Sequence, residues 1–213
     1  ADSLPDKYGS KLIERYLAEQ GRSIDTLTAV ERLLYTGKRG MGALEYVPAM
    51  DYAVTKNDVI DIRALVELAT AILTDREKLH IMDSDHTMEQ IINVGTSAGG
   101  ARAKAVVAWN RETGDVRSGQ IQAGDGYEYW LIKFDGVRNN KDKGEKEDGK
   151  SYTRIEYAYY QMAERAGIVM NECRLRQESG CYHFMTKRFD RSDTGEKLHM
   201  QSLGAMAHFD YNM

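Results

Sequence analysis

The sequence contains few of the residues that mark specialised classes of protein. Only 2 of its 213 residues are proline, which argues against a fibrous or disordered chain. No apolar run approaches the roughly 20 residues that a membrane-spanning helix needs, and the first residues lack the basic and apolar segments of a secretory signal. The 2 cysteines, Cys173 and Cys181, fit no zinc-binding pattern. They could form one disulfide, but the missing signal favours two reduced thiols in a cytoplasmic protein.

The residues that are present are typical of a soluble globular protein. Hydrophobic residues make up 42% of the chain and charged residues 29%, and this length is ample for a hydrophobic core. The formal net charge of −4 argues against a broad basic surface for binding nucleic acid. The 5 histidines do not gather into a metal-binding pattern.

Apolar periodicity divides the chain into a helical first part and a strand-rich second part. Residues at helical intervals predict helices over 8–20, 24–35 and 58–73, the last capped by Asn57. The glycines that follow the second helix predict a turn into a strand around 43–47.

After residue 90 the pattern is mostly that of strands. Short apolar runs bounded by glycine-containing turns predict strands at 91–94, 105–109, 127–134, 173–176 and 181–189. The polar stretch 138–150 predicts a solvated, mobile loop, and the tail from His199 has weak helical character.

One further helix is predicted between these strands. Ser151 is placed to cap it and Gly167 to end it. Its apolar stripe consists of Ile155, Ala158, Tyr159, Met162, Ala163 and Ala166. The order of all these elements predicts an α+β fold with an antiparallel sheet.

The first motif with chemical potential is the glycine-rich turn Gly95-Thr96-Ser97-Ala98-Gly99-Gly100-Ala101-Arg102-Ala103-Lys104. Small residues let backbone N–H groups approach phosphate oxygens, and successive donors form an anion-binding concavity. The turn is not a Walker loop, because its residue order differs and no helix follows. A glycine-rich hairpin turn without a ligand is the plainer interpretation.

The second motif is Lys133, which alternates with apolar neighbours in a predicted strand. A lysine on an otherwise buried strand needs a partner. Kinases use such a lysine to neutralise nucleotide phosphates and hold it with a helix glutamate. Glu156, near the start of the next predicted helix, is the candidate partner. The alternative is an edge-strand lysine in contact with water.

The third motif is Thr186-Lys187-Arg188-Phe189-Asp190-Arg191, at the end of the last predicted strand. Such a segment could be a hinge whose backbone C=O and N–H groups contact an adenine edge. It could equally be a strand end with surface ion pairs.

The order of these motifs along the chain resembles the HipA kinase family. The matching segments are Leu4-Pro5-Asp6, Gly42-Ala43-Leu44, the loop 97–104, Leu131-Ile132-Lys133-Phe134, Glu156-Tyr157, Ala163-Glu164-Arg165-Ala166-Gly167-Ile168 and Arg188-Phe189-Asp190-Arg191. The resemblance covers roughly residues 4–210. It implies a protein-kinase-like N-lobe, with an N-terminal segment over 1–90 and a nucleotide-binding lobe over 91–213.

The resemblance implies an ATP- and Mg²⁺-dependent serine/threonine kinase. The loop residues Ser97, Ala98, Gly99, Gly100, Ala101 and Arg102 would lie over the nucleotide phosphates, which Lys133, held by Glu156, would contact. Lys187 to Phe189 would form the adenine-contacting hinge, and Gln201 would border the nucleotide. Ser97 falls where family members autophosphorylate, a step that expels the loop and inactivates the enzyme.

The resemblance also implies partners. Known members are toxins of bacterial toxin–antitoxin pairs, and they phosphorylate proteins of translation, notably aminoacyl-tRNA synthetases. A helix-turn-helix antitoxin restrains them and provides their only link to DNA; no membrane is involved.

The chain departs from the family pattern in three places. Ala103 replaces a common proline, and His199-Met200-Gln201-Ser202 matches only in part. The family's catalytic aspartate and metal ligands come from a later helical lobe, so we expect no catalytic residue or metal ligand here and no activity of the chain alone. The alternative is a non-catalytic module, either a pseudokinase or a split antitoxin subunit.

Overall fold

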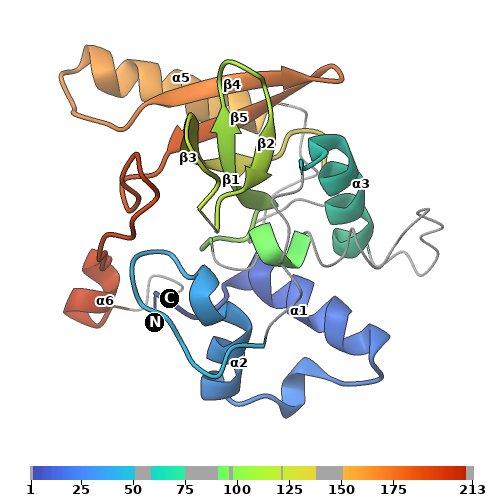
Figure 1. Ribbon diagram of the computed structural model, residues 1–213. Coiled ribbons are helices and arrows are strands. Elements are labelled where there is room, and N and C mark those ends of the chain that lie inside the picture. The colour runs from blue at the N-terminus through green and yellow to red at the C-terminus, as the bar shows by residue number, and fades with distance from the viewer. Residues whose placement is uncertain are drawn as a thin grey trace.

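The computed structural model describes residues 2–50, 59–74, 91–95, 98–120, 122–137 and 151–209. A five-stranded antiparallel sheet stands beside a helical N-terminal part, as Figure 1 shows. The strands are β1 (Lys104–Asn110), β2 (Val116–Ser118), β3 (Tyr127–Lys133), β4 (Cys173–Glu178) and β5 (Cys181–Lys187), in the order β2-β1-β3-β5-β4. The helices are α1 (Lys7–Glu19), α2 (Ala29–Thr36), α3 (Ile62–Leu73), α5 (Tyr152–Arg165) and α6 (Leu203–Ala207), with short 3-10 helices η1 (Ile24–Thr26) and η2 (Gly37–Arg39).

This combination of helices with an antiparallel sheet confirms the predicted α+β class. The sheet contains two hairpins: β1 pairs with β2 across residues 111–115, and β4 pairs with β5. At the second hairpin Ser179 and Gly180 have φ angles of 50° and 78°. Two successive positive φ angles are typical of a two-residue hairpin turn whose twist matches that of its strands. The predicted loop over 138–150 lies outside the described residues.

The two faces of the sheet pack against different helices, because side chains alternate between the faces. Ala105, Val107, Trp130, Ile132 and Met185 join α1 and α3 in the main hydrophobic core. The opposite face carries Cys173 and Phe184, which pack against Tyr160 of α5. The sheet is therefore the layer that separates α5 from α1 and α3.

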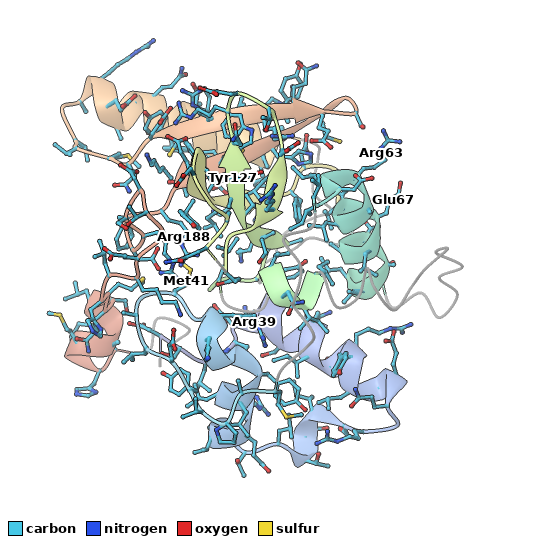
Figure 2. All side chains as sticks on the ribbon, viewed as in Figure 1. Arg39, Met41, Arg63, Glu67, Tyr127 and Arg188 are labelled. Atoms are coloured by element: carbon cyan, nitrogen blue, oxygen red, sulfur yellow. The ribbon has the colours of Figure 1, made fainter. Side chains whose placement is uncertain are left out.

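Local capping decides where the N-terminal helices begin. Thr28 and Glu31 form a capping box at the start of α2, which divides the predicted helix over 24–35 into η1 and α2. α3 begins at Ile62 and not at residue 58, because the Asp61 side chain accepts hydrogen bonds from two backbone N–H groups of its first turn. The predicted cap Asn57 lies outside the described residues. On α3, Glu67 extends away from the sheet (Figure 2), whereas Arg63 lines a small pocket with residues of the β4–β5 hairpin.

Two predicted strands are wrong. Residues 43–47 form no strand, because their backbone is engaged elsewhere: Tyr46 donates its N–H to the Gly37 carbonyl at 3.1 Å. Residues 91–94 are helical and fully enclosed. A short apolar run of this kind does not distinguish a buried strand from a buried helix.

The predicted apolar stripe of α5 faces solvent and not the sheet. Ile155, Tyr159 and Met162 are 45%, 67% and 62% exposed. The helix instead buries Thr153 and Tyr160 against β4 and β5. The two sets are offset by about half a helical turn, so the more polar face of α5 covers the sheet. As predicted, the helix ends just before Gly167, whose φ is 79°.

Candidate functional site

Lys133 and Glu156 form an ion pair between the sheet and α5. Lys133 ends β3, and its Nζ lies 2.6 Å from Glu156 Oε2. Both side chains are about 30% exposed, so the lysine is neither fully buried nor free in water. The expected partner is therefore present, and it lies in the first turns of the helix that covers this face.

The glycine-rich turn lies on the same face of the sheet as Lys133. Lys104 and Lys133 are directly paired across β1 and β3, and directly opposed residues project to the same side. Lys104 is 2% exposed, and its Nζ lies 2.9 Å from the position that a Cβ on Gly100 would occupy. Arg102 stacks on the ring of Tyr152, the first residue of α5, 3.9 Å from its centroid. Two lysines and the turn thus converge beside the start of α5.

The turn is also tied to the start of α1. Gly100 donates its N–H to Asp6 Oδ2 at 2.7 Å, and its carbonyl accepts from the Tyr8 N–H at 3.4 Å. Sequence reasoning named neither Asp6 nor Lys104 as a site residue. Lys104 could have been predicted, since it is the last residue of the glycine-rich turn. For Asp6, the residue type does not indicate a partner so distant in the chain.

The proposed hinge is held by internal contacts. Arg188 donates its backbone N–H to Tyr129 O at 2.8 Å, which places the end of β5 beside β3. Lys187 is paired with Trp130 across the sheet, so its side chain projects to the face opposite Lys133. There its Nζ pairs with Glu128 and Asp193 at 3.2 and 3.3 Å.

Arg188, Asp190 and Arg191 form a buried cluster, not the surface ion pairs of the plainer interpretation. Asp190 accepts two hydrogen bonds from Arg188, at 2.8 and 2.7 Å, and one from Arg191 at 3.0 Å. It also accepts from the backbone N–H of Gly42 at 2.6 Å, and Arg191 donates to the Gly42 carbonyl at 3.1 Å. Figure 2 shows Arg188 near Met41, where the two segments meet. The cluster therefore clamps the N-terminal part to the end of the sheet, and it leaves Phe189 63% exposed between its members.

The charges of this cluster shift one another's ionisation. Burial by itself would raise the pKa of Asp190, but the hydrogen bonds and charge of Arg188, with the Gly42 N–H and Arg191, outweigh it and lower that pKa. Burial, and the positive charge of Arg188, lower the pKa of Arg191 to about 10. Two guanidinium groups thus share one carboxylate in a buried place.

Gln201 is not brought to the turn. Gln201 is exposed and borders a cavity of about 640 Å³ between α2, residues 41–46 and residues 199–205. No residue of the glycine-rich turn lines this cavity. Ser97 lies outside the described residues, whereas Ala98, Gly99 and Ala101 lie in the described part of the turn.

The described residues contain neither a metal-binding cluster nor a membrane-spanning helix. No group of three or more histidine, cysteine, aspartate or glutamate side chains in the described ranges could hold a metal ion. Among the helices that the structure describes, none combines the length and apolar character needed to cross a bilayer.

Comparison with known proteins shows the family of this chain. No curated protein matches the chain. The model of the HipA-like C-terminal domain family matches residues 96–213, a span that begins at the glycine-rich turn and contains the whole sheet, α5 and the Arg188–Arg191 cluster. Because this span is more than half of the sequence, the chain belongs to the HipA-like family.

Proposed function

We propose that this chain provides the nucleotide-binding part of an ATP-dependent serine/threonine protein kinase. The observation that carries the proposal is the shared face of Lys133 and the turn over 98–102, with Glu156 holding the lysine at 2.6 Å. A cation held by a helix carboxylate beside a small-residue turn is the arrangement that kinases use for nucleotide phosphates.

Each residue has a defined task in this proposal. Backbone N–H groups of Gly99 to Arg102 donate to the β- and γ-phosphates, while Lys133 neutralises their charge. Glu156 positions the ammonium group, so that its direction is set before the ligand arrives. The exposed ring of Phe189, between buried neighbours, provides an apolar surface for the adenine at the end of β5.

The described residues bear on the two proposed cofactors in different ways. For ATP, Gly100 has the positive φ of 107° that favours glycine, and Lys104 Nζ lies 2.9 Å from the position of a Cβ there, which places a cation beside the turn. For Mg²⁺, which proteins usually hold with one or two carboxylates together with nucleotide phosphates, the described part of the chain contains no group of three or more candidate side chains. No step that depends on the metal is assigned to these residues.

Titration calorimetry with ATP·Mg²⁺ on the full-length protein tests the proposal. Replacing Lys133 with alanine removes a charge-assisted contact of roughly 1.5–3 kcal/mol, so we expect ATP to bind about 10- to 100-fold more weakly. The matched control is Lys197→Ala, which removes a partly buried lysine that pairs with Glu45 and should leave binding unchanged. Normal ATP binding and autophosphorylation by the Lys133→Ala protein would rule the proposal out.

Ser97 has a regulatory role in this proposal. A phosphate on this residue adds about −1.5 to −2 charges beside the turn that receives the nucleotide phosphates. Ser97→Asp in the full-length protein should therefore weaken ATP binding strongly, whereas Ser97→Ala should not. Equal affinity of the two variants in the same titration would contradict this role.

The identity of the partners rests on the family alone. We propose a cytoplasmic toxin that phosphorylates a protein of translation, such as an aminoacyl-tRNA synthetase, and that a helix-turn-helix antitoxin restrains and links to DNA. Autoradiography of a cell extract incubated with the full-length protein and labelled ATP would identify the substrate. Labelling that persists with the Lys133→Ala protein would show that another kinase produced it.

A further inference from the structure

Asp6 bridges two segments that are far apart in the sequence. Its Oδ1 accepts the N–H of Lys7 at 2.8 Å and so caps α1. Its Oδ2 accepts the N–H of Gly100 at 2.7 Å. One carboxylate thus joins the first turn of α1 to the glycine-rich turn, and the return contact from the Tyr8 N–H to the Gly100 carbonyl fixes the two together.

The Gly100 N–H is one of the donors on which phosphate binding by the turn depends. With a φ of 107° and Lys104 Nζ close on its Cβ side, this residue has little freedom to turn its N–H elsewhere. A carboxylate oxygen and a phosphate oxygen are both anionic acceptors, and one N–H makes a strong bond to only one of them. A carboxylate at this place also repels an arriving triphosphate.

We propose that Asp6 is a built-in competitor of nucleotide phosphate. In the described structure it holds the turn in a state that excludes phosphate from Gly100, and ATP must displace this carboxylate in order to bind. The start of α1 is thereby coupled to nucleotide binding at the turn, because displacement of the Asp6 carboxylate breaks the hydrogen bond between the helix cap and Gly100. This inference rests on the proposed function, since it concerns the same nucleotide site.

A purely structural cap would behave differently from a competitor. If Asp6 only positions the turn, its loss weakens ATP binding, and if it competes, its loss strengthens binding. Competition also acts on phosphate alone, so it alters the affinity for ATP and leaves the affinity for adenosine unchanged. The sign and the dependence on phosphate therefore distinguish the two roles.

The decisive variant is Asp6→Asn, measured by titration of the full-length protein with ATP·Mg²⁺ and with adenosine. Asparagine is as good a helix cap as aspartate, so its oxygen retains the contact with Lys7. Its NH₂ group replaces Oδ2 and cannot accept from Gly100. We expect ATP to bind about tenfold more tightly, equivalent to about 1.4 kcal/mol, with no change for adenosine.

Asp61→Asn is the matched control, because Asp61 caps α3 through the N–H groups of Arg63 and Ala64. It removes the same charge from the same kind of position, and ATP affinity should not change. Circular dichroism checks the fold of each variant. If Asp6→Asn does not fold, Asp6→Ser takes its place, since serine also caps helices and is too short to hold Gly100.

The outcomes separate the inference from the proposed function. Equal or weaker ATP binding by the folded Asp6 variant, with Lys133→Ala still weakening ATP binding as expected, overturns the inference alone. An equal gain for adenosine and ATP overturns it as well. Absence of ATP binding by the wild-type and all variant proteins removes the proposed function and the inference together.

Discussion

Replacement of Asp190 with alanine should be among the most damaging single changes to this protein. The carboxylate is 1% exposed and pairs with guanidinium groups of Arg188 and Arg191 that are themselves 1% and 2% exposed. It also accepts the backbone N–H of Gly42. Alanine leaves two buried cations and one buried N–H without this acceptor.

The expected loss follows from the cost of an uncompensated buried charge. Removing one partner of a buried ion pair typically costs about 3–5 kcal/mol, and here the removed partner is shared by two cations. Because total stabilities are about 5–15 kcal/mol, the change should remove a large part of the free energy of unfolding. The loss should also release the N-terminal part of the chain from the end of β5.

Urea unfolding followed by circular dichroism measures this loss. Asp193→Ala is the matched control, because Asp193 lies in the same segment, pairs with Lys187 and has a side chain that is 90% exposed. Exposed ion pairs contribute about 0–1 kcal/mol. If the two variants lost the same small amount, below about 1 kcal/mol, the buried cluster would not clamp the N-terminal part.

Three further predictions concern the site and the pH dependence. Gly100→Ala should cost about 1–3 kcal/mol in urea unfolding, because a side chain is strained at a φ of 107°, whereas Gly99→Ala, with its nearest neighbour 3.9 Å away, should be nearly neutral; equal losses would contradict this. Glu156→Gln should weaken ATP binding severalfold by releasing Lys133, yet change stability by less than about 1 kcal/mol because the pair is partly exposed; unchanged affinity would count against its positioning role. Burial lowers the pKa of His183, so the folded protein favours neutral imidazole, and its stability should fall as the pH drops below the unfolded-state pKa of about 6.5. His183→Gln should reduce this dependence between pH 7.5 and 5.5, and identical urea midpoints of the wild type at both values would refute it.

Features that depend on local patterns can be predicted from the amino-acid order alone. The strands of residues 104–110, 127–133 and 181–187 were predicted within a few residues, because alternation and turn residues act over short distances. The pairing of Lys133 with Glu156 was also predictable, since a strand lysine with apolar neighbours needs a nearby carboxylate. The predicted strand at 91–94 is wrong because a short, fully buried apolar run shows neither helical nor strand periodicity.

Which faces and segments meet depends instead on the packing of the whole chain. Strand register places Lys104 beside Lys133, and the packing of α5 turns its apolar stripe outward. Asp190 reaches Gly42, and Asp6 reaches Gly100, across sequence separations of 148 and 94 residues. A carboxylate looks the same in the sequence whether it caps a helix in water or binds a distant backbone N–H. Its partner is set by how the layers pack, which depends on the whole chain and not on neighbouring residues.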